Sequence, residues 1–251
     1  MTVAADSSRL LSPAEVAAYR RDGFIAVPHL YSAEHVLEWK RLIQSVLEEE
    51  KKQAGDAWDL TSSGVRVWNA PNIHPTLRAA MKDDRVTPIL QQIIGPNVEF
   101  LSAKAVFKND TTSFASPWHQ DWFYWEGASK ISVWIALDDA TPDNGCLKMI
   151  PGTHVKVFPK SCHEGNAFVN RIDDKEIAGL PVSTLAIKRG GAVFFHDCAV
   201  HSSYPNTAKT DRWSLISTYR DASVRDECQP SLQEYWKQPL LVCGQSVNGG
   251  A

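Results

Sequence analysis

Two residues in the middle of the chain, His119 and Asp121, combine an imidazole and a carboxylate two positions apart. The flanking residues favour extended backbone, in which side chains i and i+2 point to the same face, so both groups could reach one metal ion. His201, at the end of a β-prone run that begins at Gly190, supplies a second imidazole. Two histidines and one carboxylate leave coordination positions open, which suits non-haem Fe(II) oxygenases.

Arg212 follows His201 by eleven residues, beyond the turn-forming segment 204–207 and at the start of another β-prone run. A hairpin of that length would return Arg212 to the side of His201. Its planar guanidinium could then bind the far carboxylate of a dicarboxylate co-substrate whose other end chelates the metal.

His196 is the alternative second imidazole. It lies an odd number of residues before His201, so the two side chains would face opposite sides of a continuous strand. We therefore predict that His201 is the ligand and that His196 is a packed structural residue. His154 lies in a turn-like segment, where a rim position without a catalytic role is the favoured interpretation.

These residues belong to an ordered series of motifs that resembles the phytanoyl-CoA dioxygenase family. The series consists of His119-Gln120-Asp121, the segments 134–141, 144–147 and 150–154, and finally His201 and Arg212. An isolated His-x-Asp pair occurs by chance in many proteins, whereas the ordered set is specific. The resemblance extends from about Leu11 to about Tyr219, which is most of the chain.

The resemblance implies an enzyme that uses Fe(II), 2-oxoglutarate as co-substrate and O2. Such enzymes hydroxylate or otherwise oxidise a C–H bond while 2-oxoglutarate is converted to succinate and CO2. The metal ligands implied are His119, Asp121 and His201, and the carboxylate among them favours hydroxylation over halogenation. The implied 2-oxoglutarate contacts are Arg212, Trp134, Lys108, Ser203, Ser214 and Arg66. For the last five, the sequence leaves a purely structural role open.

An aromatic run follows the His119 motif directly. If the strand continues, Phe123 and Trp125 share the face of His119 and Asp121. Aromatic walls are typical of sites for small apolar ligands. The predicted substrate contacts are Phe123, Trp125, Gln120 and Trp122. Packing of this run under the sheet is the alternative.

The predicted substrate is a free small organic molecule, such as a natural-product intermediate. Segment 159–181 has the composition of a lid or a disordered insertion, and it carries three lysines or arginines against four acidic residues. Such a surface would repel the phosphates of an acyl-CoA. Two other functions remain open: an acyl-CoA hydroxylase, and a catalytically silent jelly-roll protein that binds metal or oxoacid as a sensor. A hydrolase using metal-bound water lacks a positioned second carboxylate.

Composition limits the partners and the compartment. The chain has 251 residues, of which 43% are hydrophobic, and its net charge is −3, so nucleic acid and anionic membranes are not expected as partners. Five scattered cysteines without a C-x-x-C pair argue against a disulfide framework. The N-terminus has no apolar segment typical of a secretory signal, and the C-terminus does not resemble a peroxisomal address. We predict a cytoplasmic protein.

The expected fold is mainly β, a double-stranded β-helix or jelly roll with N-terminal helices packed outside the sheet. We predict one domain over residues 1–251, with a helical part at 12–96, a jelly-roll core at 97–220 and a C-terminal extension at 221–251. Helices are predicted at 13–21, from 33 onward, at 75–82 and at 85–94. Strands are predicted at 24–27, 65–68, 98–107, 131–137, 146–150, 184–187, 192–196 and 212–219.

Overall fold

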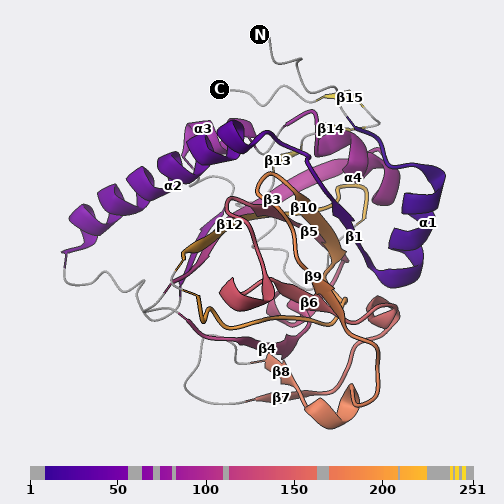
Figure 1. The fold of residues 1–251 in the computed structure, drawn as a ribbon. Coiled ribbons are helices and arrows are strands. Elements are labelled where there is room, and N and C mark those ends of the chain that lie inside the picture. The colour runs from indigo at the N-terminus through magenta and orange to yellow at the C-terminus, as the bar shows by residue number, and fades with distance from the viewer. Residues whose placement is uncertain are drawn as a thin grey trace.

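The computed structural model describes residues 9–55, 64–69, 74–80, 83–109, 113–162, 170–208, 210–224, 238–239, 241–242 and 245–246. Within these ranges the chain forms two larger antiparallel sheets and two short strand pairs, with the N-terminal helices outside (Figure 1). The mainly β, jelly-roll class predicted from the sequence is confirmed.

The first helix, α1 (Pro13–Asp22), has the boundaries that its end residues encode. The side chain of Ser12 accepts a hydrogen bond from the backbone N–H of Glu15, while the Glu15 carboxylate accepts one from Ser12, which makes a capping box. The helix ends at Gly23, whose φ of 83° lies in the left-handed region that glycine adopts without steric cost.

The second helix, α2 (Ala33–Ala54), begins after Ser32, whose hydroxyl accepts a hydrogen bond from a backbone N–H of the first turn. α3 (Pro75–Ala80) and α4 (Thr87–Ile93) are shorter. The predicted end of α3 at residues 81–82 lies outside the described residues. The inner face of α2 is formed by Val36, Trp39, Ile43 and Leu47, all of which are buried.

The larger sheet has seven strands in the order β1-β10-β5-β12-β3-β13, with β2 also paired to β3. The strands are β1 (Phe24–Val27), β2 (Val65–Asn69), β3 (Val98–Lys108), β5 (Lys130–Ala136), β10 (Ala192–His196), β12 (Arg212–Asp221) and β13 (Gln238–Pro239). The long pair β3–β12 has a defined register in which Arg212 lies opposite Lys108 and Ile216 lies opposite Lys104.

The smaller sheet has four strands in the order β4-β11-β6-β9. These are β4 (Ser116–His119), β6 (Leu147–Met149), β9 (Ser183–Leu185) and β11 (His201–Ser203). Two further antiparallel pairs join β7 (Lys160–Cys162) to β8 (Asn170–Ile172) and β14 (Leu241–Val242) to β15 (Gln245–Ser246).

Alternation along the central strands divides the interior into two layers. On β5, Val133 and Ile135 pack with the helices, whereas Trp134 and Ala136 pack toward the smaller sheet. Strand geometry causes this division, because successive side chains point to opposite faces. In Figure 1 the smaller sheet lies below the larger one and the helices lie around its upper side. The space between the two sheets is therefore where residues from distant segments meet.

The segment predicted as a lid packs elsewhere. Its described part forms the β7–β8 hairpin and a short 3₁₀-helix (Asp174–Glu176), while residues 163–169 lie outside the described ranges. Ile172 and Ile177 pack in a cluster that also contacts Trp118, which alternates with His119 along β4. The hairpin thus covers the outer face of the smaller sheet, below β4 in Figure 1.

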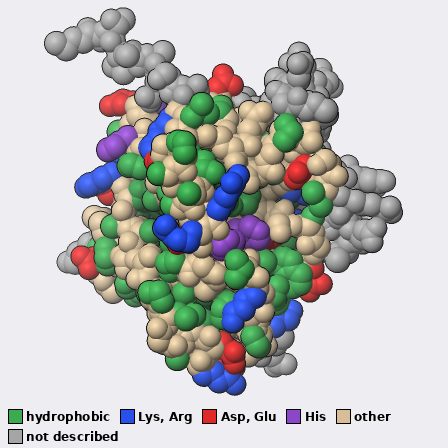
Figure 2. Space-filling view, turned by 90° about the vertical axis from the view of Figure 1, so that its right-hand side faces the viewer, with side chains coloured by type: hydrophobic (Ala, Val, Ile, Leu, Met, Phe, Trp, Pro, Cys, Tyr) green, Lys and Arg blue, Asp and Glu red, His purple; other side chains and the backbone are tan. Residues whose placement is uncertain are grey.

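The surface carries no block of one charge sign on the face shown in Figure 2, where basic, acidic and hydrophobic side chains are interspersed and histidines lie near the centre. Within the described residues, no helix has both the length and the apolar character required to cross a membrane.

Candidate active site

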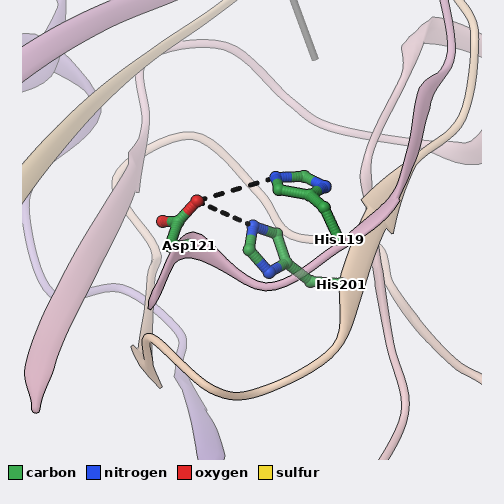
Figure 3. Close-up of side chains that lie close together, drawn as sticks. All are labelled: His119, Asp121 and His201. Atoms are coloured by element: carbon green, nitrogen blue, oxygen red, sulfur yellow. Dashed lines mark ion pairs between the residues drawn. The ribbon is translucent and has the colours of Figure 1, made fainter. Parts of the chain in front are cut away.

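His119, Asp121 and His201 meet between the two sheets, as Figure 3 shows. His119 is the last residue of β4 and His201 is the first residue of β11, and the two are direct partners in the antiparallel register. Asp121 begins a 3₁₀-helix (Asp121–Tyr124) that follows β4. The bend after His119 turns the carboxylate back toward the two imidazoles.

The three side chains present their donor atoms to a common centre. Oδ1 of Asp121 lies 3.6 Å from Nε2 of His119 and 3.7 Å from Nε2 of His201. Metal–ligand bonds of about 2.1 Å place the donor atoms of one ion roughly 3 to 4 Å apart. All three residues are buried. The separations and the donor types therefore fit a single divalent metal ion.

Both imidazoles are oriented by the backbone. Nδ1 of His119 lies 2.8 Å from the carbonyl oxygen of Pro117, and Nδ1 of His201 lies 3.0 Å from that of Ala199. A carbonyl can only accept, so Nδ1 carries the proton in each ring and Nε2 keeps its lone pair. Such outer hydrogen bonds fix the tautomer and direction of histidines that bind metals.

The charge states of the triad also suit a cation. Burial and the neighbouring His119 lower the pKa of His201 to about 4, so this imidazole is neutral at physiological pH. Burial by itself would raise the pKa of Asp121, but Lys104, His201 and His119 outweigh it and hold this pKa below its usual range. The site thus offers a neutral imidazole at His201 and a charged carboxylate at Asp121.

Two buried cations lie together beside the triad. Arg212 and Lys108 are each 1% exposed and are paired residues on β12 and β3. Nη1 of Arg212 donates to Ser214 Oγ at 3.0 Å, while Nε of Arg212 is buried without a hydrogen-bond partner among the described residues. The guanidinium also lies 5.6 Å from the ring centre of Trp134.

The Lys108 ammonium is held by three acceptors. Nζ donates to Phe114 O at 2.7 Å, to Ser203 Oγ at 2.8 Å and to Tyr204 O. Burial and the charge of Arg212 lower the pKa of Lys108 to about 7. Because its three N–H groups are engaged, Lys108 can act on a bound anion through its charge. Two adjacent buried cations create a site for a carboxylate.

A pocket of about 470 Å³ joins the triad to these cations. Its lining includes His119, Asp121, Tyr124, Trp125, Trp134, His201, Ser203, Arg212, Lys108 and Lys104, with Val65, Val67, Ser102, Val106, Phe114, Ser116, Leu147, Phe195 and Ile216. A more open surface depression of about 1000 Å³ surrounds Asp138. Its cations Lys40 and Arg189 already form ion pairs with Asp138, at 2.6 and 2.9 Å.

The structure brings His201 and Arg212 to one pocket, but not by the predicted hairpin. β11 belongs to the smaller sheet and β12 to the larger sheet, so the chain crosses between the sheets after Ser203. His196 and His201 do not share a continuous strand as the sequence suggested, since β10 ends at His196 and a turn separates it from β11. His196 nevertheless lies outside the pocket, as expected of a structural residue.

The prediction for the aromatic run is wrong in part, because the strand does not continue past His119. The 3₁₀-helix gives three residues per turn, so side chains two apart diverge. Tyr124 and Trp125 line the pocket, whereas Phe123 and Trp122 do not. Phe123 instead lies beneath Lys160, whose Nζ is 4.8 Å from the ring centre.

Gln120 and Arg66 are also placed away from the pocket. Gln120 is fully buried, with Nε2 donating to the carbonyls of Lys156 and Cys198 and Oε1 accepting from the backbone N–H of Phe158. Arg66 alternates with the pocket residues of β2, and its Nε lies 2.6 Å from Oε2 of Glu50. Neither residue lines the pocket that contains the triad.

Ser203 lines the pocket, whereas Ser214 does not line it and contacts Arg212 instead. Ser214 Oγ accepts from Arg212 and donates to the Val106 carbonyl at 3.0 Å, so its only proton is already used. It therefore orients the guanidinium. Ser203 Oγ lies 2.7 Å from Ser116 Oγ as well as accepting from Lys108.

The second histidine group lies apart from the triad. His154 and His196 have ring centres 5.6 Å apart, and Nδ1 of His196 accepts from the backbone N–H of Cys198 at 3.1 Å. Asp197, which is fully buried, lies 3.0 Å from this nitrogen and holds the indole N–H of Trp125 at 3.0 Å. Through Asp197, this group therefore holds the side chain of Trp125, which forms part of the pocket wall.

Sequence reasoning missed Lys104 and Tyr124. The alternation of β3 could have identified Lys104, because it lies four residues before Lys108 and therefore on the same face. For Tyr124, no signal in the sequence indicated that a 3₁₀-helix would replace the strand.

The sequence matches a known family over most of its length. Residues 19–214 match the phytanoyl-CoA dioxygenase (PhyH) family. The chain is 28% identical to L-proline trans-4-hydroxylase of Streptomyces griseoviridis, over 80% of this chain and 83% of that protein. It is 24% identical to the ectoine dioxygenase of Bordetella bronchiseptica, over 83% of this chain and 75% of that protein.

Solved structures have the same fold. The non-haem α-ketoglutarate-dependent carbocyclase SnoK from nogalamycin biosynthesis aligns with a TM-score of 0.70 at 22% identity, covering 96% of this chain and 94% of that one. EctD from S. alaskensis, with 2-oxoglutarate and 5-hydroxyectoine, aligns with a TM-score of 0.69 at 21% identity, covering 86% and 78%. Together with the match over residues 19–214, these relationships show that the chain is a member of the phytanoyl-CoA dioxygenase family of Fe(II)- and 2-oxoglutarate-dependent dioxygenases.

Proposed function

We propose that the chain hydroxylates a C–H bond of a free small molecule in the pocket between its two sheets. In this proposal one O2 and one 2-oxoglutarate are consumed for each C–H bond hydroxylated, and succinate and CO2 are released. One oxygen atom of O2 enters the product and the other enters succinate. The observation that carries the proposal is the continuity of the triad, the two buried cations and the apolar walls within one cavity.

At the metal end, His119, Asp121 and His201 would hold Fe(II). The ion would supply the capacity to activate O2, which no side chain has. The protein supplies two imidazoles already in the required tautomer and a carboxylate that stays charged at neutral pH. Because these donors come from only three side chains, positions remain for the oxoacid and O2.

At the oxoacid end, Arg212 would bind the distal carboxylate of 2-oxoglutarate. Burial lowers the pKa of Arg212 to about 10, as expected of a guanidinium removed from water without a carboxylate in direct contact. A carboxylate would satisfy its unpaired Nε, and Lys108 would add a second positive charge. Trp134 and Ser203 line the same end and would complete its walls.

The remaining space fits a compact substrate. A cavity of about 470 Å³ lies within the usual range of roughly 300–1,000 Å³ for small-molecule sites, and it must also hold the oxoacid. Most of its walls beyond the triad are apolar or aromatic, from Tyr124, Trp125, Val67 and Ile216, with Ser102 and Lys104 as polar exceptions. The charges of segment 159–181 do not decide against an acyl-CoA substrate, because no described residue of that segment lines this pocket. Cavity size now supports the preference for a free small molecule.

Succinate release tests the proposal. The purified chain is supplied with Fe(II), ascorbate and 2-oxoglutarate, with and without a panel of free amino acids, cyclic metabolites and acyl-CoAs. The relative named for L-proline makes L-proline the first compound of the panel. We expect succinate in amounts equal to the hydroxylated product, with one oxygen of the product derived from isotopically labelled O2.

Two results would contradict the proposal. Absence of succinate under every condition, with Fe(II) bound, would favour the catalytically silent binding protein. Coupled turnover with acyl-CoAs alone would favour the acyl-CoA hydroxylase.

A further inference from the structure

One strand, β3, carries polar side chains along the whole pocket. Lys104 and Lys108 lie four residues apart, on the face that lines the cavity. At about 3.3 Å per residue, their Cα atoms are roughly 13 Å apart. Lys108 lies opposite Arg212, whereas Lys104 lies opposite Ile216. Lys104 is therefore at the end of the pocket away from the two cations of the oxoacid site.

The Lys104 ammonium has no direct anionic partner in the described part of the chain. Its Nζ lies 5.1 Å from the centre of the Trp125 ring, a cation–π contact. Lys104 lines the same pocket as Asp121 and His201. No hydrogen bond or ion pair joins the Nζ atom of Lys104 to any described residue. A half-buried cation in an apolar cavity without a hydrogen-bond partner is suited to an incoming anion.

The wall beneath Lys104 is held rigidly. The indole N–H of Trp125 donates to Oδ2 of the fully buried Asp197 at 3.0 Å. The same oxygen accepts the backbone N–H of Lys130 at 3.0 Å, which anchors it to β5. The aromatic face is thus fixed before a ligand binds, and fixing it in advance reduces the entropy lost on binding.

We propose that Lys104 and Trp125 form an acid-recognition site, so that the substrate is a small molecule bearing a carboxylate. The ammonium of Lys104 would bind that carboxylate, and the body of the molecule would lie against Trp125 and Tyr124 beside the triad. This proposal rests on the proposed function and specifies its substrate class. The Lys130 ammonium lies 5.7 Å from the centre of the same Trp125 ring, but it donates to the carbonyls of Glu126 and Ala128 and does not line the pocket. The one described ammonium that lines this end therefore matches one negative charge, whereas a phosphate dianion would bring a second charge toward Asp121.

Pairs of compounds that differ only in charge test this site. We expect the anaerobic complex with Fe(II) and 2-oxoglutarate to have a visible charge-transfer absorption that shifts when a molecule binds beside the metal. It is titrated with L-proline and L-prolinamide, L-pipecolic acid and its amide, and 3-phenylpropionic acid and its amide. We expect at least one acid to shift the band and its amide to bind at least tenfold more weakly.

Three variants assign the effect to Lys104. Lys104→Met should weaken binding of the responding acid by about tenfold to a hundredfold, the usual range for a charge-assisted hydrogen bond, while binding of its amide changes little. Lys104→Arg should restore most of the acid affinity. Lys175→Met is the matched control, since Lys175 is 75% exposed and lies outside the pocket.

The outcomes separate this proposal from the function it rests on. No charge-transfer band with Fe(II) and 2-oxoglutarate would contradict the proposed function itself. A normal band with equal responses to acids and amides, or with no response to any acid, would overturn the acid site alone. Equal loss of acid and amide binding in Lys104→Met would also overturn it, because Lys104 would then act only on the charge of Asp121.

Discussion

His119 and His201 lie directly opposite one another on the antiparallel strands β4 and β11, with ring centres 4.1 Å apart. Sheet register therefore determines the position of both imidazoles. A slip of one residue would turn one ring to the outer face of the smaller sheet, where Trp118 packs. The backbone contacts of both Nδ1 atoms then fix the direction of each ring.

Removing His119, Asp121 or His201 by substitution with alanine should abolish Fe(II) binding, because three donors are the minimum in this site and the described residues offer no fourth nearby. His196→Ala should retain Fe(II), since its ring lies outside the pocket. Iron content after anaerobic desalting measures both. Iron retained by His201→Ala but lost by His196→Ala would show that the wrong histidine was assigned.

Arg212→Ala should weaken 2-oxoglutarate binding about tenfold to a hundredfold, as expected for the loss of charge-assisted hydrogen bonds worth roughly 1.5–3 kcal/mol. Fe(II) should remain bound. Titration of the charge-transfer band with 2-oxoglutarate gives the dissociation constant. Arg21→Ala is the control, because Arg21 is 72% exposed and its one ion pair within the described residues is with the neighbouring Asp22. Unchanged affinity in Arg212→Ala would contradict the assignment of the oxoacid end.

The affinity for 2-oxoglutarate should fall as the pH rises through about 7. Burial and Arg212 lower the pKa of Lys108 from 10.5 to about 7, so its charge is present below this pH and is lost above it. Binding a carboxylate favours the charged form, so binding should be accompanied by proton uptake above pH 7. Titrations across pH 6–9 measure the effect, and Lys108→Met should bind more weakly at low pH with a flat profile. A wild-type profile that is flat would exclude a role for the Lys108 charge.

The same pKa shift affects stability. Between about pH 7 and 10.5 the unfolded chain binds a proton at Lys108 that the folded protein does not, so this residue makes the free energy of unfolding rise with pH over that interval. Below pH 7 both states are protonated, and the contribution no longer changes with pH.

Gln120→Ala should destabilise the fold by about 2–4 kcal/mol, because it leaves two backbone carbonyls and one backbone N–H buried without their partners. Urea denaturation followed by fluorescence measures the change in the free energy of unfolding. Substrate and oxoacid affinities should be preserved in the folded fraction. A large loss of affinity without loss of stability would show that Gln120 contacts the substrate or the oxoacid.

The repetitive features of the fold were predictable from local sequence signals. The Ser12 capping box and Gly23 determine α1, and the run of β-formers at 192–196 coincides with β10. The ordered motifs around His119, His201 and Arg212 identified the residues that meet in the pocket. These signals depend on residues close together in the sequence, and the structure follows them because tertiary packing is compatible with the same local conformations.

The path between these residues was not predictable in the same way. A hairpin turn and a connection between two sheets are both rich in polar residues, so the segment that joins β11 to β12 resembled a hairpin turn in the sequence. Asp121 was expected to align with His119 along a strand, whereas a bend brings it there. Phe123 was misplaced for a related reason, because strand parity holds only where the strand and its face are already known. Arg66 was assigned from the family resemblance, and in the structure it pairs with Glu50 instead.

Strand β3, which runs along the pocket, has a consequence for how this protein could change its specificity. Backbone pairing with β12 fixes the distance between positions 104 and 108, whatever side chains these positions carry. A new side chain at position 104, or at position 102 two residues further along, would alter which molecules are accepted while Lys108 and Arg212 keep their register. Substrate selectivity could therefore be changed without changing the residues proposed to bind 2-oxoglutarate. Laboratory evolution for new substrates could begin at positions 102 and 104.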